Sequence, residues 1–500
     1  MKKLVRHTFL CLSLFASFQA SAQIESIPTR FDLRDSIDMY GARTQDFSDM
    51  TCWAYAATVA AEASLAYRGV CSDSLSVKHM VDNNLYKTKE TTEKGNQLYA
   101  ISYFSRGDGP VLATDESVRV CDLSELLLIP NKIDSIKWAV NKYGAVFSAA
   151  CTNQLRGGLL GYYNSEKNSS YLSPDDAASY SISANHAVVI IGYDDNFNNF
   201  DDNPLYRPSA PGAWLVQNSN GAEWGDRGCA WISYESAFIG ESAAVFSAST
   251  KDLSDTVFQY NDLNATNYLS AGTDSLYSVT FFTASDEALR TSFVGVDTRL
   301  PDTHVEVEII PGSTLAELNE SDPLVKKDTL FALPGFHLIP VSTDLTPGDD
   351  FAVNVLQYVA TDVVVSVATE DLTKRLRPSS APSGKQYLFT DTGKLYEFPT
   401  STRQRNLCQK LYAFKLSTTD NTDVETDGTN LLRAWSPSPR TLSLHGDEID
   451  SAALLPIHIY NVSGHLVTTV RHLPATLSLP QGGVYIVLTP TSALRVFVSY

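Results

Sequence analysis

Hydrophobic positions between residues 28 and 248 follow first helical and then strand periodicities. Residues 52–67 are apolar and rich in alanine, which predicts a helix with a large buried face. In residues 133–143 apolar side chains recur three and four positions apart, and Asp134 suits the first turn of a second helix. Apolar runs of strand length follow at residues 187–193, 213–217 and 230–234. Helices first and strands later predict an α+β domain with two segregated parts.

At about residue 250 this pattern gives way to short runs in which apolar and polar side chains alternate. A period of two is typical of half-buried strands, and these runs recur between turn residues. They cover residues 277–282, 304–309, 351–356 and 363–367. The sequence therefore predicts an all-β sandwich over residues 249–416.

The segment after the predicted sandwich has a different composition. Residues 417–430 consist mainly of Thr, Asp, Asn and Gly, which leaves almost no apolar side chain to bury. A flexible linker is therefore expected over residues 417–438. Short amphipathic or apolar runs return at residues 457–460, 483–488 and 494–498, and they predict a small β domain over residues 439–500.

The first 22 residues have the pattern of an export signal. A positively charged start precedes an apolar core over residues 9–18, and small residues follow at positions 20–22. The apolar core is too short to span a membrane. A lipoprotein anchor at Cys11 is disfavoured because the two residues before it are large. We therefore expect residues 1–22 to be a cleaved signal peptide, export of the mature chain, and a first domain over residues 23–248.

Charge and cysteine content exclude several classes of function. The formal net charge of −19 at pH 7 argues against a nucleic-acid partner, because little positive charge would neutralise the phosphates. It equally disfavours an anionic membrane surface. Of the seven cysteines, six remain after removal of Cys11, too few in so long a chain for a scaffold held by disulfides.

No cofactor or metal ion is expected from the sequence. The segment 194–203 is rich in oxygen ligands, which could suggest calcium. It lacks a glycine at the turn and a closing glutamate at the spacing of a calcium loop. A solvated acidic insertion is the favoured interpretation.

Three residues in separate segments form a candidate catalytic set. Cys52 opens the first predicted helix, where the amide dipoles favour a thiolate and activate it. His186 heads one apolar run, and Asn218 follows another. A thiol nucleophile needs a base within hydrogen-bond reach, and the base needs a third group that orients its ring. Each residue alone has an ordinary structural explanation, but the three together predict a Cys–His–Asn triad.

These segments resemble the papain-like cysteine peptidases, a family for which a cysteine with a distant histidine and asparagine is characteristic. The similarity runs in order through the first domain. It is carried by residues 31–35, 52–57, 75–82, 143–146, 185–193 and 212–228. The resemblance implies a two-part papain-like catalytic domain and protein or peptide substrates. No inhibitory propeptide of the family's usual kind fits between Gln23 and Phe31.

The resemblance also implies roles for particular residues. Cys52 would attack the scissile carbonyl, and His186 would act as acid and then as base. Asn218 would keep the His186 ring aligned, and Gln45 would complete an oxyanion hole with the Cys52 backbone N–H. The substrate cleft and the shielding of the triad are expected to involve Met50, Trp53, Gly95 and Trp224.

The sequence departs from the family's pattern around this site. Gln45 lies one residue further from Cys52 than is usual in the family. Met50 replaces a glycine that lines the cleft, so we expect a narrower pocket for the residue on the acyl side. Asn220 replaces a tryptophan beside the triad, and Asp49 replaces a cysteine, so a disulfide familiar in the family cannot form.

The two later domains carry resemblances of their own. Residues 257–263, 277–284 and 294–296 resemble the lectin-like β domain attached to many bacterial papain-like peptidases. Two interpretations of this domain are equally supported: it binds carbohydrate, or it only packs against the peptidase domain. Residues 459–467 and 479–487 resemble the carboxy-terminal sorting domain of type IX secretion substrates, a system of the Bacteroidota. This resemblance implies the secretion machinery as a partner and a secreted or cell-surface location, after Sec-dependent export and outer-membrane translocation.

The sequence thus favours a secreted cysteine endopeptidase that works through a thioester acyl-enzyme. An alternative from another class is a surface adhesin or glycan-binding protein on a catalytically impaired peptidase scaffold. Met50, Asn220 and the shifted Gln45 favour this alternative, whereas the complete set of Cys52, His186 and Asn218 disfavours it. A third alternative, amide-forming or transpeptidation chemistry at the same thiol, has little support in the residues.

Overall fold

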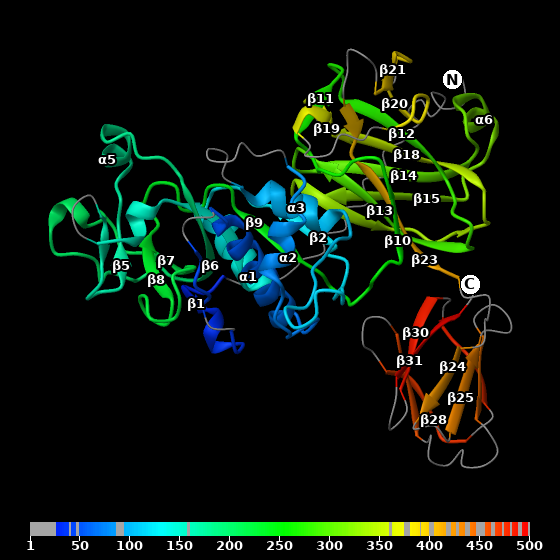
Figure 1. The fold of residues 1–500 in the computed structure, drawn as a ribbon, viewed down its shortest axis with the longest axis horizontal. Coiled ribbons are helices and arrows are strands. Elements are labelled where there is room, and N and C mark those ends of the chain that lie inside the picture. The colour runs from blue at the N-terminus through cyan, green and yellow to red at the C-terminus, as the bar shows by residue number, and fades with distance from the viewer. Residues whose placement is uncertain are drawn as a thin grey trace, which may run out of the picture. The chain divides into compact units, whose positions relative to one another are not determined.

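The computed structural model divides the chain into two compact units, Met1–Lys415 and Leu416–Tyr500 (Figure 1). The structure describes residues 27–39, 42–46, 50–86, 95–157, 161–359, 363–374, 381–390, 392–399, 405–416, 422–426, 430–435, 441–446, 456–461, 466–472, 475–480, 483–488 and 493–498. The signal peptide expected over residues 1–22 lies outside the described residues. In the described part of the chain, no helix is long and apolar enough to cross a membrane.

The first part of unit 1 contains both helices and strands, as the sequence predicts. The helices are α1 (Cys52–Tyr67), α2 (Val77–Asp82), α3 (Gln97–Ser105), α4 (Ile133–Tyr143) and α5 (Pro174–Ser179), with short 3₁₀ turns at Leu33–Asp35, Thr152–Leu155 and Pro204–Tyr206. The strands are β1 (Arg30–Asp32), β2 (Glu125–Leu128), β3 (Val146–Ala150), β4 (Tyr163–Asn164), β5 (Ser169–Ser170), β6 (His186–Asp194), β7 (Ala213–Gln217), β8 (Cys229–Ser233) and β9 (Ala244–Ser247).

Helix α1 forms the centre of this part. Several of its alanines have no exposed surface, and their small side chains let the helix pack closely on β6 and β9. Glu62 in α1 is 5% exposed, so its carboxylate would be costly to bury without partners. The Arg43 guanidinium pairs with it, and the Leu75 backbone N–H donates to it. These bonds tie the segments before and after α1 to the helix.

A sheet forms the second half of the same part. Strand β6 pairs antiparallel with β1, β3 and β7, and β7 pairs antiparallel with β8. Eight of the nine residues of β6 are buried, because both faces of this strand are covered. Helix α4 contacts β3, β6 and β9, and its residues Ile136, Ala139, Val140 and Tyr143 contribute to this core.

The second part of unit 1 is a β-sandwich with one short helix, α6 (Leu315–Glu320), and a 3₁₀ turn, Leu372–Lys374. Its strands are β10 (Thr256–Gln259), β11 (Asn267–Ser270), β12 (Ser275–Thr283), β13 (Leu289–Thr298), β14 (Thr303–Pro311), β15 (Val325–Phe331), β16 (Gly335–Pro340), β17 (Asp344–Leu345), β18 (Asp350–Val359), β19 (Ser366–Asp371), β20 (Gln386–Thr390), β21 (Leu395–Phe398), β22 (Arg405–Leu407) and β23 (Gln409–Lys415). One sheet has the order β15-β14-β18-β12-β20-β21. Alternate residues of β14 are buried against the facing sheet, which includes β13, β16 and β23.

The sandwich and the first part share one continuous sheet. Strand β2 pairs antiparallel with β9 of the first part and, on its other side, with β16 of the sandwich. Leu126 of β2 lies opposite Phe246 on one side and Phe336 on the other, and all three side chains are buried. Because the ladder of backbone hydrogen bonds runs through β2, the sandwich is more than a neighbouring domain that packs on the surface.

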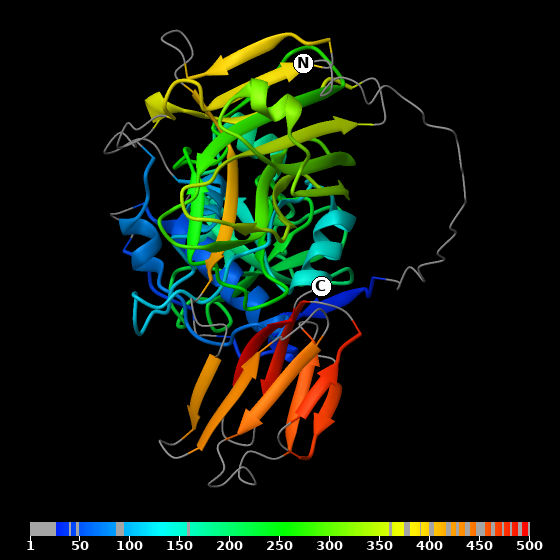
Figure 2. The ribbon, with the colours of Figure 1, turned by 90° about the vertical axis from the view of Figure 1, so that its right-hand side faces the viewer.

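Unit 2 is a small all-β module (Figure 2). Its strands are β24 (Thr422–Thr426), β25 (Asn430–Trp435), β26 (Thr441–Gly446), β27 (Ile457–Asn461), β28 (Leu466–Val470), β29 (Ala475–Ser478), β30 (Gly483–Leu488) and β31 (Ala493–Val498). They form two four-stranded sheets around a core that includes Leu442, Leu444, Ile457, Ile459 and Val487.

The structure differs here from one expectation. Strands β24 and β25 lie inside residues 417–438, for which the composition predicts a flexible linker, and β25 pairs with both β24 and β26. Threonine is polar in composition counts, but its β-branched side chain favours strands.

Candidate active site

Cys52 is the first residue of α1, and Thr51 is the residue that precedes the helix. Cys52 is buried, with 7% of its surface exposed. Backbone N–H groups of the first helical turn point at this end of α1, and they favour negative charge there. The position therefore suits a thiolate.

His186 and Asn218 are brought together by the pairing of β6 with β7. His186 begins β6, and Asn218 directly follows the last residue of β7. His186 Nε2 lies 2.8 Å from Asn218 Oδ1, and both side chains are buried. The Ser219 backbone N–H also donates to Asn218 Oδ1, at 2.8 Å.

The bond from the Ser219 N–H identifies the Asn218 atom that faces His186 as the amide oxygen, and this fixes which atom donates in the bond between His186 and Asn218. Because Asn218 Oδ1 can only accept, His186 Nε2 carries the hydrogen of the bond between them. Proton uptake and release then fall to Nδ1, the other nitrogen of the His186 ring. Since α1 packs directly on β6, the helix that begins at Cys52 and the strand that begins at His186 lie side by side.

Gln45 is attached to the residue that follows Asn218. Its backbone N–H donates to the Ser219 carbonyl at 2.9 Å, and its Oε1 accepts from Ser219 Oγ, also at 2.9 Å. Gln45 is 4% exposed. Since Oε1 accepts from Ser219, the donor group Nε2 is not used in this bond. Residues 47–49, which belong to the segment between Gln45 and Cys52, lie outside the described residues.

Ser219 was not among the predicted site residues. Its position directly after Asn218 was the only available signal, because nothing in the spacing reveals that it contacts Gln45, 174 residues earlier. Through Ser219, Gln45 is held next to Asn218.

The predicted cleft residues lie in three different settings. Trp53 is buried beside Cys52 and contacts the edge of the Tyr99 ring, with 5.4 Å between the ring centroids. Gly95 lies against Trp53, since a Cβ on Gly95 would be only 2.3 Å from the indole. Trp224 is half-buried and stacks on Tyr163, with centroids 5.0 Å apart.

Met50 is the most unusual of the predicted cleft residues. Its side chain is 46% exposed, and its backbone has a φ of 54°, in the left-handed region that favours glycine. Asn220, which replaces the family's tryptophan, follows Ser219 and pairs through its backbone with Thr44.

The described residues outside the candidate triad contain no candidate metal site. No group of three or more His, Cys, Asp or Glu side chains in that part of the chain could hold a metal ion. Of the acidic insertion, Asp201 accepts from Asn164 Nδ2 and Asp202 pairs with Lys167. The six cysteines that follow residue 22 are buried and form no disulfide in the described structure.

Comparisons with known proteins agree with this architecture. Residues 257–413 match the family model described as the lectin-like domain. A solved structure of the clostridial cysteine protease Cwp84 after propeptide cleavage is similar over 78% of this chain and 100% of its own, with a TM-score of 0.66 and 19% identity. The cysteine protease and lectin-like domains of Cwp84, a surface layer associated protein of Clostridium difficile, match over 78% of this chain and 89% of theirs, with a TM-score of 0.65 and 19% identity.

The fold is therefore that of a papain-like cysteine peptidase scaffold followed by a lectin-like β domain. This confirms the predicted order of an α+β part and an all-β sandwich in unit 1. At 19% identity, the similarity establishes the fold and leaves the chemistry to the residues of the site.

Proposed function

We propose that the protein is a secreted cysteine endopeptidase in which Cys52 is the nucleophile, His186 the acid and base, and Asn218 the residue that orients the base. The observation that carries the proposal is the 2.8 Å contact between His186 Nε2 and Asn218 Oδ1, on a strand that packs against the helix opened by Cys52. A thiol, a base and an orienting group are the parts that this chemistry requires.

The steps follow from these positions. The Cys52 thiolate attacks the scissile carbonyl carbon, and the developing oxyanion is stabilised by the Cys52 backbone N–H and Gln45 Nε2. The protonated His186 then gives its proton to the leaving amine as the C–N bond breaks, which forms a thioester. The neutral His186 takes a proton from water as the water attacks the thioester. Cleavage of the C–S bond then releases the carboxylic acid product and regenerates the Cys52 thiolate beside the protonated His186.

A thiol-directed probe tests this function. The mature protein is incubated with a peptidyl epoxide, digested, and searched for the modified cysteine. We expect labelling at Cys52 alone, because burial raises the pKa of Cys121 to about 12 and that of Cys229 to about 11 and keeps those thiols protonated. His186→Ala is expected to lower the labelling rate. A native protein that hydrolyses no peptide and takes up no label at Cys52 would favour the catalytically impaired adhesin instead.

Residues 439–500 are proposed to act as a sorting domain that delivers the peptidase through type IX secretion. Their resemblance to such domains supports this, and so does the separate compact unit that the chain forms after Lys415. The lectin-like domain adds carbohydrate as a candidate ligand class, with no residue assigned to it.

Removal of residues 416–500 is expected to lower the amount of protein at the cell surface and in the medium while the purified truncated protein retains peptide hydrolysis. Quantification of extracellular antigen from cells that express either form checks this, with the Cys52→Ala full-length protein as the control for delivery without activity. Equal extracellular yields of the two forms contradict the sorting role.

A further inference from the structure

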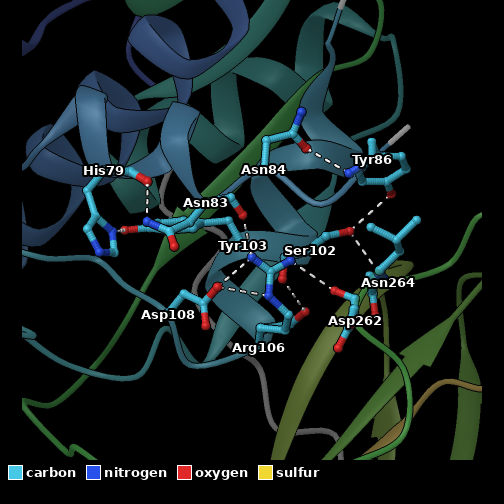
Figure 3. Close-up of polar contacts among 12 residues, drawn as sticks. His79, Asn83, Asn84, Tyr86, Ser102, Tyr103, Arg106, Asp108, Asp262 and Asn264 are labelled. Carbon is cyan, nitrogen blue, oxygen red and sulfur yellow. Dashed lines mark hydrogen bonds and ion pairs between the residues drawn. The ribbon is translucent and has the colours of Figure 1, made fainter. Parts of the chain in front are cut away.

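A loop of the lectin-like domain makes hydrogen bonds to helix α3 of the peptidase part and to Arg106, which directly follows that helix (Figure 3). The Asn264 backbone N–H donates to Ser102 Oγ at 2.7 Å, and Arg106 Nη1 donates to the Asp262 carbonyl at 2.9 Å. Ser102 and Asn264 are each 1% exposed. The contact therefore excludes water, and a hydrogen bond lost here is not replaced by solvent.

The lectin-like sandwich holds this loop in place. Glu370 Oε1 accepts from the backbone N–H groups of Asp262 and Leu263, at 3.0 and 2.7 Å. Asn264 Nδ2 donates to Asp297 Oδ2 at 2.7 Å. Because these carboxylates belong to strands β19 and β13, the position of the Asn264 backbone is set by the sandwich.

On the peptidase side, Ser102 connects the loop to a stack of aromatic rings. Ser102 Oγ donates to the Leu98 carbonyl at 2.9 Å, so the 3.0 Å bond with Tyr86 is one that the Tyr86 hydroxyl donates. The Tyr86 ring lies flat on Tyr99, with centroids 3.8 Å apart and an interplanar angle of 4°. Tyr99 in turn contacts Trp53.

This series of contacts ends beside the nucleophile. Trp53 follows Cys52, and its indole is the surface on which the Gly95 backbone lies, with no room for a Cβ. Gly95 is only partly buried, so its backbone, which is predicted to lie in the substrate cleft, faces solvent beside the Trp53 indole. Any tilt of the indole must move the Gly95 backbone, because the interior is close-packed.

We propose that Ser102 is a positioning residue through which the lectin-like domain sets the substrate-cleft wall at Gly95 and thereby the enzyme's side-chain preference. The inference rests on the proposed peptidase function. Without the Ser102 hydroxyl, the Asn264 N–H loses its acceptor, and the Tyr86 hydroxyl keeps only the longer 3.5 Å contact with the Leu98 carbonyl. The ring stack then loses its hydrogen-bonded link to Asn264. The triad itself is untouched, because none of these bonds involves His186 or Asn218.

The test compares Ser102→Ala with Ser105→Ala in the full mature chain. Ser105 is an equally buried serine of α3 whose hydroxyl donates to the Ser102 carbonyl and not to the ring stack. The measurement is kcat/KM over peptides that vary, one position at a time, on both sides of the scissile bond. The pH dependence of Cys52 alkylation by iodoacetamide is measured in parallel.

We expect Ser102→Ala to change the ratio of kcat/KM between aromatic and small residues about fivefold at one substrate position, the scale of one lost hydrogen bond. The pH profile of alkylation should stay unchanged. Tyr86→Phe, which keeps the ring and loses only its hydroxyl, should reproduce the change in this ratio. Ser102→Thr, which keeps a hydroxyl at this position, should retain the wild-type ratio.

Parallel peptide profiles for wild type and Ser102→Ala, or the same change in Ser105→Ala, overturn the inference while the proposed function stands. A shift of the alkylation profile in Ser102→Ala also overturns it, because the variant would then act on the triad. A wild-type protein that hydrolyses none of the peptides and does not react at Cys52 overturns the proposed function, and this inference with it.

Discussion

Replacement of Cys52 by alanine is expected to lower kcat/KM for peptide hydrolysis by about 10⁴-fold or more, because no other group can form the thioester. Cys52 and alanine differ by one sulfur atom at a helix start, so we expect the unfolding temperature to change little. The measurements are steady-state hydrolysis of a fluorogenic peptide and thermal unfolding on the same preparation.

The matched control for this variant is Cys71→Ala. Cys71 is 6% exposed, comparable to Cys52, but burial raises the pKa of its thiol above the usual value and so disfavours a thiolate. Its loss should leave hydrolysis within about twofold of wild type, a difference of about 0.4 kcal/mol. If Cys52→Ala retained turnover within about tenfold of wild type, the nucleophile would have to be another group.

The spacing of apolar residues predicted those helices and strands whose pattern depends only on residues close in the sequence. Helix α4 spans Ile133–Tyr143 and β7 spans Ala213–Gln217, as the apolar spacing indicated. Strand β19 begins at Ser366, whereas the apolar run had suggested a start at Val363, and Val363 is exposed. An apolar run marks a buried strand only where a partner covers it.

Contacts between distant segments could not be predicted. The strand β2 was not predicted, and its four residues contain no information about pairing with both β9 and β16. In the same way, Ser102 and Asn264 are separated by 162 positions, and each is an ordinary polar residue in the sequence. The continuity of the two parts of unit 1 is therefore a property of the tertiary structure alone.

The candidate active site likewise combines features that the sequence predicts with features that only the structure shows. Residue type and order nominated Cys52, His186 and Asn218, and the structure adds the 2.8 Å contact between the last two. The bond from Ser219 to Gln45 and the backbone conformation of Met50 needed coordinates. A left-handed residue is readable from sequence only where glycine or asparagine occupies it, and here the position holds a methionine.

The conformation of Met50 suggests a variant with little effect on folding. A residue with a side chain at φ of 54° costs about 1 kcal/mol relative to glycine. Glycine also loses more conformational entropy on folding, which costs about 0.4–1 kcal/mol. These effects are opposite and similar in size, so Met50→Gly should leave the free energy of unfolding nearly unchanged. Differences in activity would then report on the side chain itself.

Met50→Gly is expected to raise kcat/KM for peptides with a large residue on the acyl side of the scissile bond by about tenfold relative to peptides with Gly or Ala there. Met50 lies two residues before Cys52, and crowding by a few methylenes costs about 1–3 kcal/mol. The lower end of that range applies because the side chain is 46% exposed and can move partly aside.

Met50→Ala separates the effect of the long side chain from the effect of the backbone conformation. Alanine keeps a Cβ and the left-handed backbone but lacks the flexible thioether. If the side chain narrows the pocket, alanine should give most of the gain that glycine gives. A gain with glycine alone would instead assign the effect to the backbone before Thr51, whose conformation leads into α1. A matched peptide series measured on all three proteins decides the matter: profiles that differ only by a constant factor would show that Met50 does not line the pocket.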